Sequence, residues 1–195
     1  MGILFLDLET TGIPKRNSAT RGFYPPTEYH HYDGSRAIEI GYILVSHDNE
    51  KILEKSILIK PDGYDVTNSH IHGITMQILC DKGIHITEAL DIFLSAVEQA
   101  DTVVCYNNDF DINILVSECY RYGREDVAQS LLQKTQVCAM KTAMEFFGRR
   151  RYMKLIDCYK EFNPGIEYEQ KHRAVDDCEL TRDIYFKMMF PKCSG

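Results

Sequence analysis

The sequence predicts an α/β fold in which a mixed β-sheet is flanked by helices. Two observations support this fold class. Apolar runs of strand length come first in the chain, and a helix, one more strand and several amphipathic helices follow them. The chain has 195 residues, of which 44% are hydrophobic, and a chain of this size buries a core. We therefore expect a single domain over residues 1–195.

Four strands are expected. The continuous apolar run at 3–8 is typical of a strand buried on both faces. Residues 37–46 and 51–60 are strand-like and are joined by Ser-His-Asp-Asn-Glu, a turn composition, so they predict a hairpin. Residues 102–106 predict a further short buried strand.

Five helices are expected, and most of them end at a glycine or proline. Their approximate ranges are 87–99, 111–122, 137–147, 154–162 and 174–189. Residues 13–35, here called the 13–35 loop, are polar and rich in aromatic residues, glycine and proline, and loops of this length are usually functional or mobile.

Basic and aromatic residues occur together in two segments. In the 13–35 loop they suit stacking on bases and pairing with phosphates, although a solvated loop explains them equally well; they are Lys15, Arg16, Arg21, Phe23, Tyr24 and Tyr29. The run Arg149-Arg-Arg151, with Tyr152 and Lys154, suits upstream phosphates, and a charged surface turn is the alternative.

The composition limits the classes of binding partner and the cellular location that are expected. The net charge of −7 argues against a protein that coats duplex DNA through a basic surface. No apolar run of about 18 residues is present, so no membrane partner is expected. The N-terminus lacks the basic region of a secretory signal. Seven cysteines without CxxC spacing predict reduced thiols and a cytoplasmic location.

Asp7 and Glu9 are the first candidate site residues. They lie two positions apart at the end of an apolar strand, so their side chains point to the same face. Two carboxylates in a core stay ionised only beside a compensating cation. The alternative is an acid pair at the exposed end of the strand.

Asp111, Asp177 and His172 complete the candidate set. Asp111 lies where a buried strand meets a helix, and capping that helix is its alternative role. Asp177 shares the inward stripe of the last helix with Ile184, and the alternative is a structural ion pair with Arg173 or another base. His172 precedes that helix by about a turn.

Oxygen ligands from separate elements favour Mg²⁺, with Mn²⁺ as a substitute. Two such ions roughly 4 Å apart activate a water and stabilise the leaving oxygen in phosphoryl displacement. A histidine nearby is a candidate general base. These residues therefore predict a hydrolase that cleaves phosphodiester bonds.

Five motifs in this order resemble those of the DnaQ-like 3′–5′ exonucleases, the histidine subtype of the DEDD superfamily. The main motifs are Phe5-Leu-Asp7-Leu-Glu9-Thr10-Thr11-Gly12, Asn107-Asn-Asp-Phe110-Asp111 and His172-Arg-Ala-Val-Asp-Asp177. The secondary ones are Ala37-Ile-Glu-Ile-Gly41 and Ile71-His-Gly-Ile74. The resemblance covers residues 3 to 189 and implies a ribonuclease H-like fold with a mixed five-stranded sheet.

The resemblance also implies roles. Asp7, Glu9, Asp111 and Asp177 would ligate two Mg²⁺ ions, and His172 would deprotonate the attacking water. The residues implied on the substrate side are Thr10, Thr11, His72, Ile74, Asn107 and Tyr106, the last standing where many members have histidine. The substrate would be the 3′ end of single-stranded DNA or RNA, the products nucleoside 5′-monophosphates, and the assembly a homodimer or a polymerase subunit.

Two other functions fit part of this pattern. Asp7-Leu-Glu9-Thr-Thr resembles the Asp-x-Asp-x-Thr start of haloacid dehalogenase-type phosphatases, with Asp176-Asp177 as their acidic pair. That assignment has Glu in place of the second Asp and gives His172 no role. The other alternative is an inactive exonuclease-fold binding subunit of a polymerase, which the intact acids oppose.

Overall fold

The computed structural model of the chain describes residues 1–191 and contains a five-stranded sheet in the order β3-β2-β1-β4-β5. β1 pairs antiparallel with β2 and parallel with β4. At the edges of the sheet, β3 pairs antiparallel with β2 and β5 pairs parallel with β4. The mixed α/β sheet is therefore confirmed. The strands are β1 (Gly2–Thr10), β2 (Ala37–Val45), β3 (Lys51–Leu58), β4 (Ala100–Cys105) and β5 (Thr135–Cys138).

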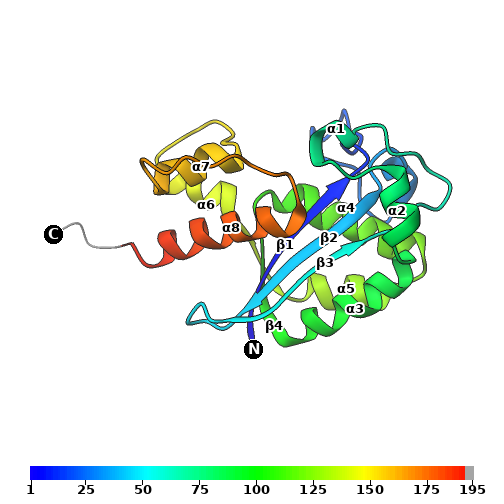
Figure 1. Cartoon of the computed structure of the whole chain (residues 1–195), viewed down its shortest axis with the longest axis horizontal. Coiled ribbons are helices and arrows are strands. Elements are labelled where there is room, and N and C mark those ends of the chain that lie inside the picture. The colour runs from blue at the N-terminus through cyan, green and yellow to red at the C-terminus, as the bar shows by residue number, and fades with distance from the viewer. Residues whose placement is uncertain (192–195) are drawn as a thin grey trace.

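Helices cover both faces of the sheet (Figure 1). They are α1 (Ser69–His72), α2 (Met76–Lys82), α3 (Ile86–Gln99), α4 (Asn108–Arg121), α5 (Glu125–Leu132), α6 (Ala139–Phe146), α7 (Leu155–Phe162) and α8 (Ala174–Met189), with a 3₁₀ turn η1 (Tyr29–Tyr32). Within residues 1–191, no helix combines the length and the apolar character that crossing a bilayer requires.

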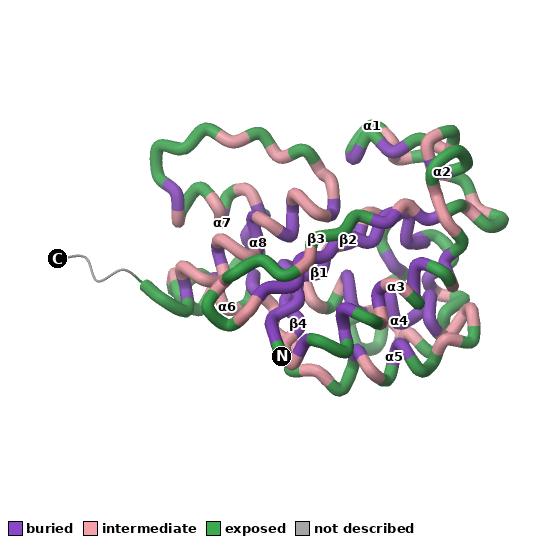
Figure 2. Tube along the Cα trace, turned by 60° about the horizontal axis from the view of Figure 1, so that its bottom comes forward, coloured by how far each residue is buried: buried purple, intermediate pink, exposed green. Residues whose placement is uncertain are grey.

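β1 lies at the centre of the molecule and contributes side chains to a hydrophobic core on each face of the sheet (Figure 2). Leu4 and Leu6 pack with α3, α4 and α5, whereas Ile3 and Phe5 pack with α6, α7 and α8. This two-sided burial explains the continuous apolar run in the sequence. Asp7 and Glu9 continue the Ile3–Phe5 series, so they face α8.

The helix predicted at 137–147 is wrong at its start. Residues 135–138 form β5, which pairs in parallel with β4, and α6 begins only at Ala139. A four-residue edge strand is too short to show an alternation of apolar and polar residues. The predicted helix was therefore started two residues too early, inside β5. The predicted bounds of the last helix, Ala174–Met189, are confirmed.

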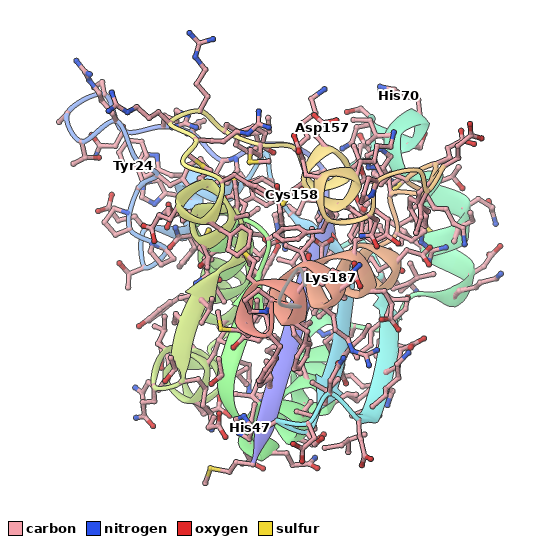
Figure 3. The ribbon with its side chains drawn as sticks, turned by 90° about the vertical axis from the view of Figure 1, so that its left-hand side faces the viewer. Tyr24, His47, His70, Asp157, Cys158 and Lys187 are labelled. Carbon is pink, nitrogen blue, oxygen red and sulfur yellow. The ribbon has the colours of Figure 1, made fainter. Side chains whose placement is uncertain are left out.

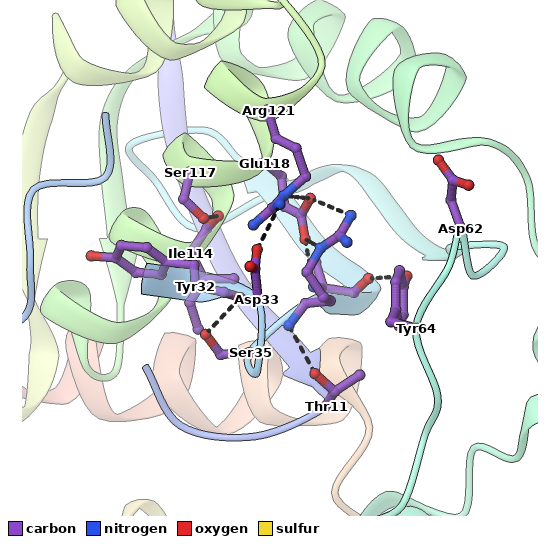
Figure 4. A network of polar contacts seen from close by, with 12 residues as sticks. Thr11, Tyr32, Asp33, Ser35, Asp62, Tyr64, Ile114, Ser117, Glu118 and Arg121 are labelled. Atoms are coloured by element: carbon purple, nitrogen blue, oxygen red, sulfur yellow. Dashed lines mark hydrogen bonds and ion pairs between the residues drawn. The ribbon is translucent and has the colours of Figure 1, made fainter. Parts of the chain in front are cut away.

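The 13–35 loop has a defined shape, and a buried ion pair fixes its end to α4. Arg36 donates from Nε to Glu118 Oε1 at 2.7 Å and from Nη2 to Oε2 at 3.0 Å. The Ala37 N–H donates to the same carboxylate at 3.1 Å, and the Arg36 guanidinium lies 4.5 Å from the centre of the Tyr64 ring. Figure 4 shows Glu118 at the centre of this network.

Candidate active site

The candidate site lies where β1 and β4 end. These two strands are parallel, so their carboxyl ends meet at one edge of the sheet, the usual place for ligands in α/β proteins. Figure 3 shows Tyr24 of the 13–35 loop, Asp157 of α7 and His70 of α1 at this end of the molecule, whereas His47 in the β2–β3 turn lies at the opposite end. Loops and short helices therefore surround the site.

The register of β1 against β2 explains how α8 reaches the site. Asp7 is paired with Gly41 and Glu9 with Glu39, and cross-strand partners share a face of the sheet. A Cβ atom on Gly41 would lie 2.5 Å from the Ala174 carbonyl carbon. The start of α8 therefore rests directly on Gly41, beside Asp7.

Glu39 fixes the start of α8 by charge and hydrogen bonds. Its buried carboxylate accepts from Arg173 Nη2 at 2.6 Å and Nε at 3.0 Å, and from the Ala174 N–H at 3.1 Å. Burial alone would raise the pKa of Glu39, but the donors, Arg173 foremost and then Ser56, hold it below its ordinary value. Arg173 is thereby committed to Glu39, so the alternative pairing of Arg173 with Asp177 is wrong.

The acids converge from separate elements. One ligand atom from each of Asp7, Glu9 and Asp177 lies within 4.8 Å of the other two. Asp111 is buried beside them, and its Oδ1 accepts the Leu8 N–H at 3.2 Å. The residue at the N-cap of α4 is Asn107, so the capping role considered for Asp111 is wrong.

Burial and mutual repulsion raise the pKa values of these acids. Burial, together with the charges of Asp111 and Asp177, raises the pKa of Asp7 well above its ordinary value. Burial and then Asp177 raise the pKa of Glu9 to about 8. Burial raises the pKa of Asp111 to about 8, against the hydrogen bond from Leu8, and that of Asp177 to about 6. Among residues 1–191, the charge of Arg173 lowers the pKa of Glu9 only enough to offset part of this rise.

The arrangement fits a hard cation. Asp177 Oδ2 accepts from Gln170 Nε2 at 2.7 Å, whereas the buried Oδ1 has no hydrogen-bond partner among residues 1–191. A buried carboxylate oxygen without a partner is costly and is a natural ligand for an ion. Every candidate ligand is a carboxylate, the donor type that Mg²⁺ and Mn²⁺ prefer.

A cleft of about 580 Å³ opens above the acids. Ile13, Arg16 and Phe23 from the 13–35 loop line one part of it, and Tyr152 and Lys154, from the segment after α6, line another. Two of the six residues singled out in the loop therefore reach the site. In the basic run, Arg149 pairs instead with Glu161.

His172 lines the same cleft and has a backbone φ of 50°. A positive φ is uncommon for a residue other than glycine, and it turns the chain immediately before Arg173 and α8. Gln170, which also lines the cleft, was not identified from the sequence. Nothing in its local pattern distinguishes it, because its partner Asp177 is reached only through the fold.

Asn107 and Tyr106 line the cleft as well. The Tyr106 hydroxyl donates to the Met153 carbonyl at 2.8 Å, so it ties β4 to the segment that carries Tyr152. This contact gives the tyrosine, which stands where many family members have histidine, a structural task. Substrate contacts by both residues stay predictions.

The other residues predicted to contact substrate lie at the end of β1 and in or next to α1. Thr10 donates its hydroxyl hydrogen to the Gly12 carbonyl at 2.8 Å, and Thr11 Oγ1 accepts the Arg36 N–H at 2.9 Å. His72 and Ile74 are buried near α1 and α2 and do not line the cleft. Their roles toward substrate likewise stay predictions.

A comparison with protein families decides the assignment. The model of the RNase_T family, described as Exonuclease, matches residues 4–185 of this chain. The chain belongs to this exonuclease family. The predicted membership of the DnaQ-like exonucleases and the predicted enzyme class are thereby confirmed.

Individual relatives agree with this family. DNA polymerase III subunit epsilon of Haemophilus influenzae is 26% identical over 188 residues, which are 95% of this chain and 66% of the relative. The exonuclease DPD1 of Arabidopsis thaliana is 23% identical, and the match covers 55% of it. The chain thus spans slightly less than two thirds of the first of these relatives.

Solved structures share the fold. Exonuclease X in complex with 5′-overhanging duplex DNA superposes with a TM-score of 0.60 at 18% identity, over 97% of this chain and 92% of that one. Escherichia coli exonuclease I in complex with a dA16 oligonucleotide gives 0.70 at 19% identity, over 97% and 40%. The predicted ribonuclease H-like architecture is therefore confirmed.

Proposed function

We propose that this chain removes nucleotides one at a time from the 3′ end of DNA, as a single exonuclease domain. The observation that carries the proposal is the carboxylate cluster of Asp7, Glu9 and Asp177 on the floor of an open cleft. It occurs in a member of an exonuclease family. The products would be nucleoside 5′-monophosphates.

The four acids would hold two Mg²⁺ ions, replaceable by Mn²⁺. When bound, these ions would neutralise the phosphate and acidify the attacking water. Several of the chain's own residues prepare the site: Gln170 fixes one oxygen of Asp177 and leaves the other free. Glu39 and Gly41 hold α8 beside β1, so the acids are in position before substrate arrives.

His172 is the proposed general base, which would place the chain in the histidine subtype. It lines the same cleft as the four acids and lies five residues before Asp177. A ring nitrogen would accept the proton from the attacking water, and the water oxygen would form a bond to the phosphorus that joins the last two nucleotides. The bond from that phosphorus to the O3′ atom of the penultimate nucleotide would break, and O3′ would leave and take up a proton from solvent. Arg173, held by Glu39, fixes the backbone next to this histidine.

The walls of the cleft suit a single strand. Phe23 and Tyr152 would stack on bases, while Arg16 and Lys154 would pair with phosphates. DNA is proposed because named relatives are DNA polymerase III subunits and because similar structures hold DNA. A polymerase partner is proposed on the likeness to the polymerase III subunit. A homodimer stays a prediction, and size-exclusion chromatography with light scattering of the purified protein separates monomer from dimer.

A degradation assay tests the function. With Mg²⁺, a 5′-labelled single-stranded DNA is expected to yield a ladder that shortens from the 3′ end, and excess EDTA should abolish it. His172→Ala is expected to lower the rate by about 10²–10⁴-fold, the usual contribution of a general base. His70→Ala, at an exposed histidine of α1, is the matched control and should retain activity.

Three results would contradict this function: full cleavage in EDTA, equal activity of the His172 and His70 variants, or release of phosphate from small monoesters without any mononucleotide. The last is the outcome expected of the phosphatase alternative. A matched RNA strand in the same assay decides the sugar preference, and faster degradation of RNA would replace DNA as the proposed substrate.

The raised pKa values predict that cation binding stabilises the protein more at pH 8 than at pH 5. Folded Asp177, Glu9 and Asp111 have pKa values of about 6, 8 and 8, above the roughly 4 expected in the unfolded chain. Their contribution to folding is therefore complete below about pH 4 and is lost as the pH rises through 6 to 8. Cations that bind the ionised acids offset this loss.

The measurement is the Tm of EDTA-treated protein, with and without Mn²⁺, from pH 5 to pH 8.5. The increase in Tm that Mn²⁺ produces is expected to grow with pH. An increase of the same size at pH 5 and pH 8.5 would show that these carboxylates are not where the cation binds.

A further inference from the structure

We propose that Glu28, His30 and His31 form a second metal site, for Zn²⁺, on the 13–35 loop. Each residue offers one ligand atom, and the three atoms lie within 4.8 Å of one another. None of them lines the cleft that holds the acid cluster. The inference is independent of the proposed nuclease function, because it concerns other residues and another class of metal.

The backbone of η1 brings the ligands together. The His31 N–H donates to the Glu28 carbonyl at 3.0 Å, an i to i+3 bond of the 3₁₀ type. Residues three apart eclipse each other in a 3₁₀ turn, so Glu28 and His31 project to the same side. His31 Nε2 lies 3.4 Å from Glu28 Oε2. Two ligands of one tetrahedral Zn²⁺, at about 2.0–2.1 Å from the ion, are roughly 3.3–3.4 Å apart.

Neighbouring contacts hold the His31 ring and the backbone of the turn in place. The ring of His31 stacks on Tyr24, with centroids 3.6 Å apart and an angle of 14° between the planes. Arg121 donates to the Tyr29 carbonyl at 2.7 Å and pairs with Asp33 at 2.8 Å. Arg121 thus contacts the chain at Tyr29, just before the two histidines, and at Asp33, shortly after them. The His31 ring and the turn that carries both histidines are therefore preorganised, which lowers the entropic cost of binding an ion.

The donor set selects the metal. Two imidazoles and one carboxylate are a ligand set of zinc sites, whereas Mg²⁺ is held by oxygen alone. His30 is exposed and His31 half-buried, so an ion enters from solvent, and water completes its coordination. An ion bound to both Glu28 and His31 would tie the start of η1 to its centre and stiffen the loop.

The simpler explanation is a hydrogen-bonded histidine–carboxylate pair, and the chain contains a matched example. His47 lies 2.9 Å from Asp101 at the opposite end of the molecule, with its side chain 59% exposed. Only one imidazole is present there, so this pair should not retain zinc. His47→Ala is therefore the control for a change at an exposed histidine.

Zinc titration of untagged protein tests the proposal. The parent for the titration is Asp7→Asn/Asp177→Asn, which removes the acid cluster as a competing site, and the unaltered chain is titrated in parallel. The parent is expected to bind one equivalent of Zn²⁺ and to gain Tm on binding. His30→Ala/His31→Ala should remove that equivalent, Glu28→Gln should weaken it, and His47→Ala should leave it intact.

Co²⁺ gives a spectroscopic check, because tetrahedral Co²⁺ absorbs visible light much more strongly than octahedral Co²⁺. The strong absorption should appear in the parent and disappear in the double-histidine variant. Three results would overturn the proposal: no zinc bound by the parent or the unaltered chain, an undiminished equivalent in the double-histidine variant, or the same loss in His47→Ala. Nuclease activity is measured separately, so the two proposals fail or stand independently.

Discussion

Replacing Asp7 by asparagine is expected to lower the nuclease rate by about a thousandfold or more. Asp7 lies at the centre of the cluster, where Asp111, Asp177 and Glu9 all raise its pKa after burial itself. An amide of the same shape carries no charge to hold a cation, and that loss is worth several kcal/mol of transition-state stabilisation. Each 1.36 kcal/mol is about tenfold in rate. The measurement is kcat on single-stranded DNA at saturating Mg²⁺.

The same substitution should not destabilise the metal-free protein at pH 8, because it removes a carboxyl group whose ionisation is disfavoured by burial and by the neighbouring acids. Loss of activity with an unchanged or higher Tm therefore separates a chemical role from a structural one. Asp65→Asn, at an exposed acid between β3 and α1, is the control and should change neither quantity. Retention of activity in the Asp7 variant would remove that carboxylate from the mechanism.

Replacing Arg36 by methionine is expected to cost about 3–5 kcal/mol in the free energy of unfolding. The substitution leaves Glu118, 1% exposed, without the guanidinium that donates to both of its oxygens. Breaking a buried ion pair from one side typically costs this much, because the remaining charge loses its closest partner; Arg121 Nε, 3.7 Å from Glu118 Oε2, compensates only part of it. Urea denaturation followed by circular dichroism gives the value.

Two further variants make the test specific. Arg36→Met/Glu118→Leu removes both charges and should recover most of the stability. Lys141→Met breaks an exposed pair with Asp109, 2.8 Å apart, and should change the free energy of unfolding by less than about 1 kcal/mol. A single Arg36 variant as stable as the Lys141 variant would show that the network of Figure 4 does not hold the 13–35 loop.

Periodicity was sufficient to find the acids that the fold brings together. Asp7 and Glu9 share a face because β1 alternates, and Asp177 points inward because it shares a stripe with the buried Ile184. These assignments need only the local repeat of a strand or a helix. The end of α8 was also predicted correctly, because Pro191 follows it in the sequence.

Features that depend on contacts between distant segments could not be predicted in this way. Glu39 and Gly41 were identified only as part of a motif, and their task of seating α8 follows from the β1–β2 register. The pairing of Arg173 with Glu39, 134 positions away, excludes the pairing with Asp177 that sequence proximity suggested. β5 was missed because its four residues are too few to show the alternation of a strand.

The most direct test of the four-acid cation centre is a crystal of the protein soaked in Mn²⁺ and measured near the manganese absorption edge. Two anomalous peaks are expected, each coordinated by carboxylate oxygens from the set Asp7, Glu9, Asp111 and Asp177, with Asp177 Oδ1 among the ligands. Manganese found only elsewhere, or those carboxylates ordered without any ion between them, would contradict the account.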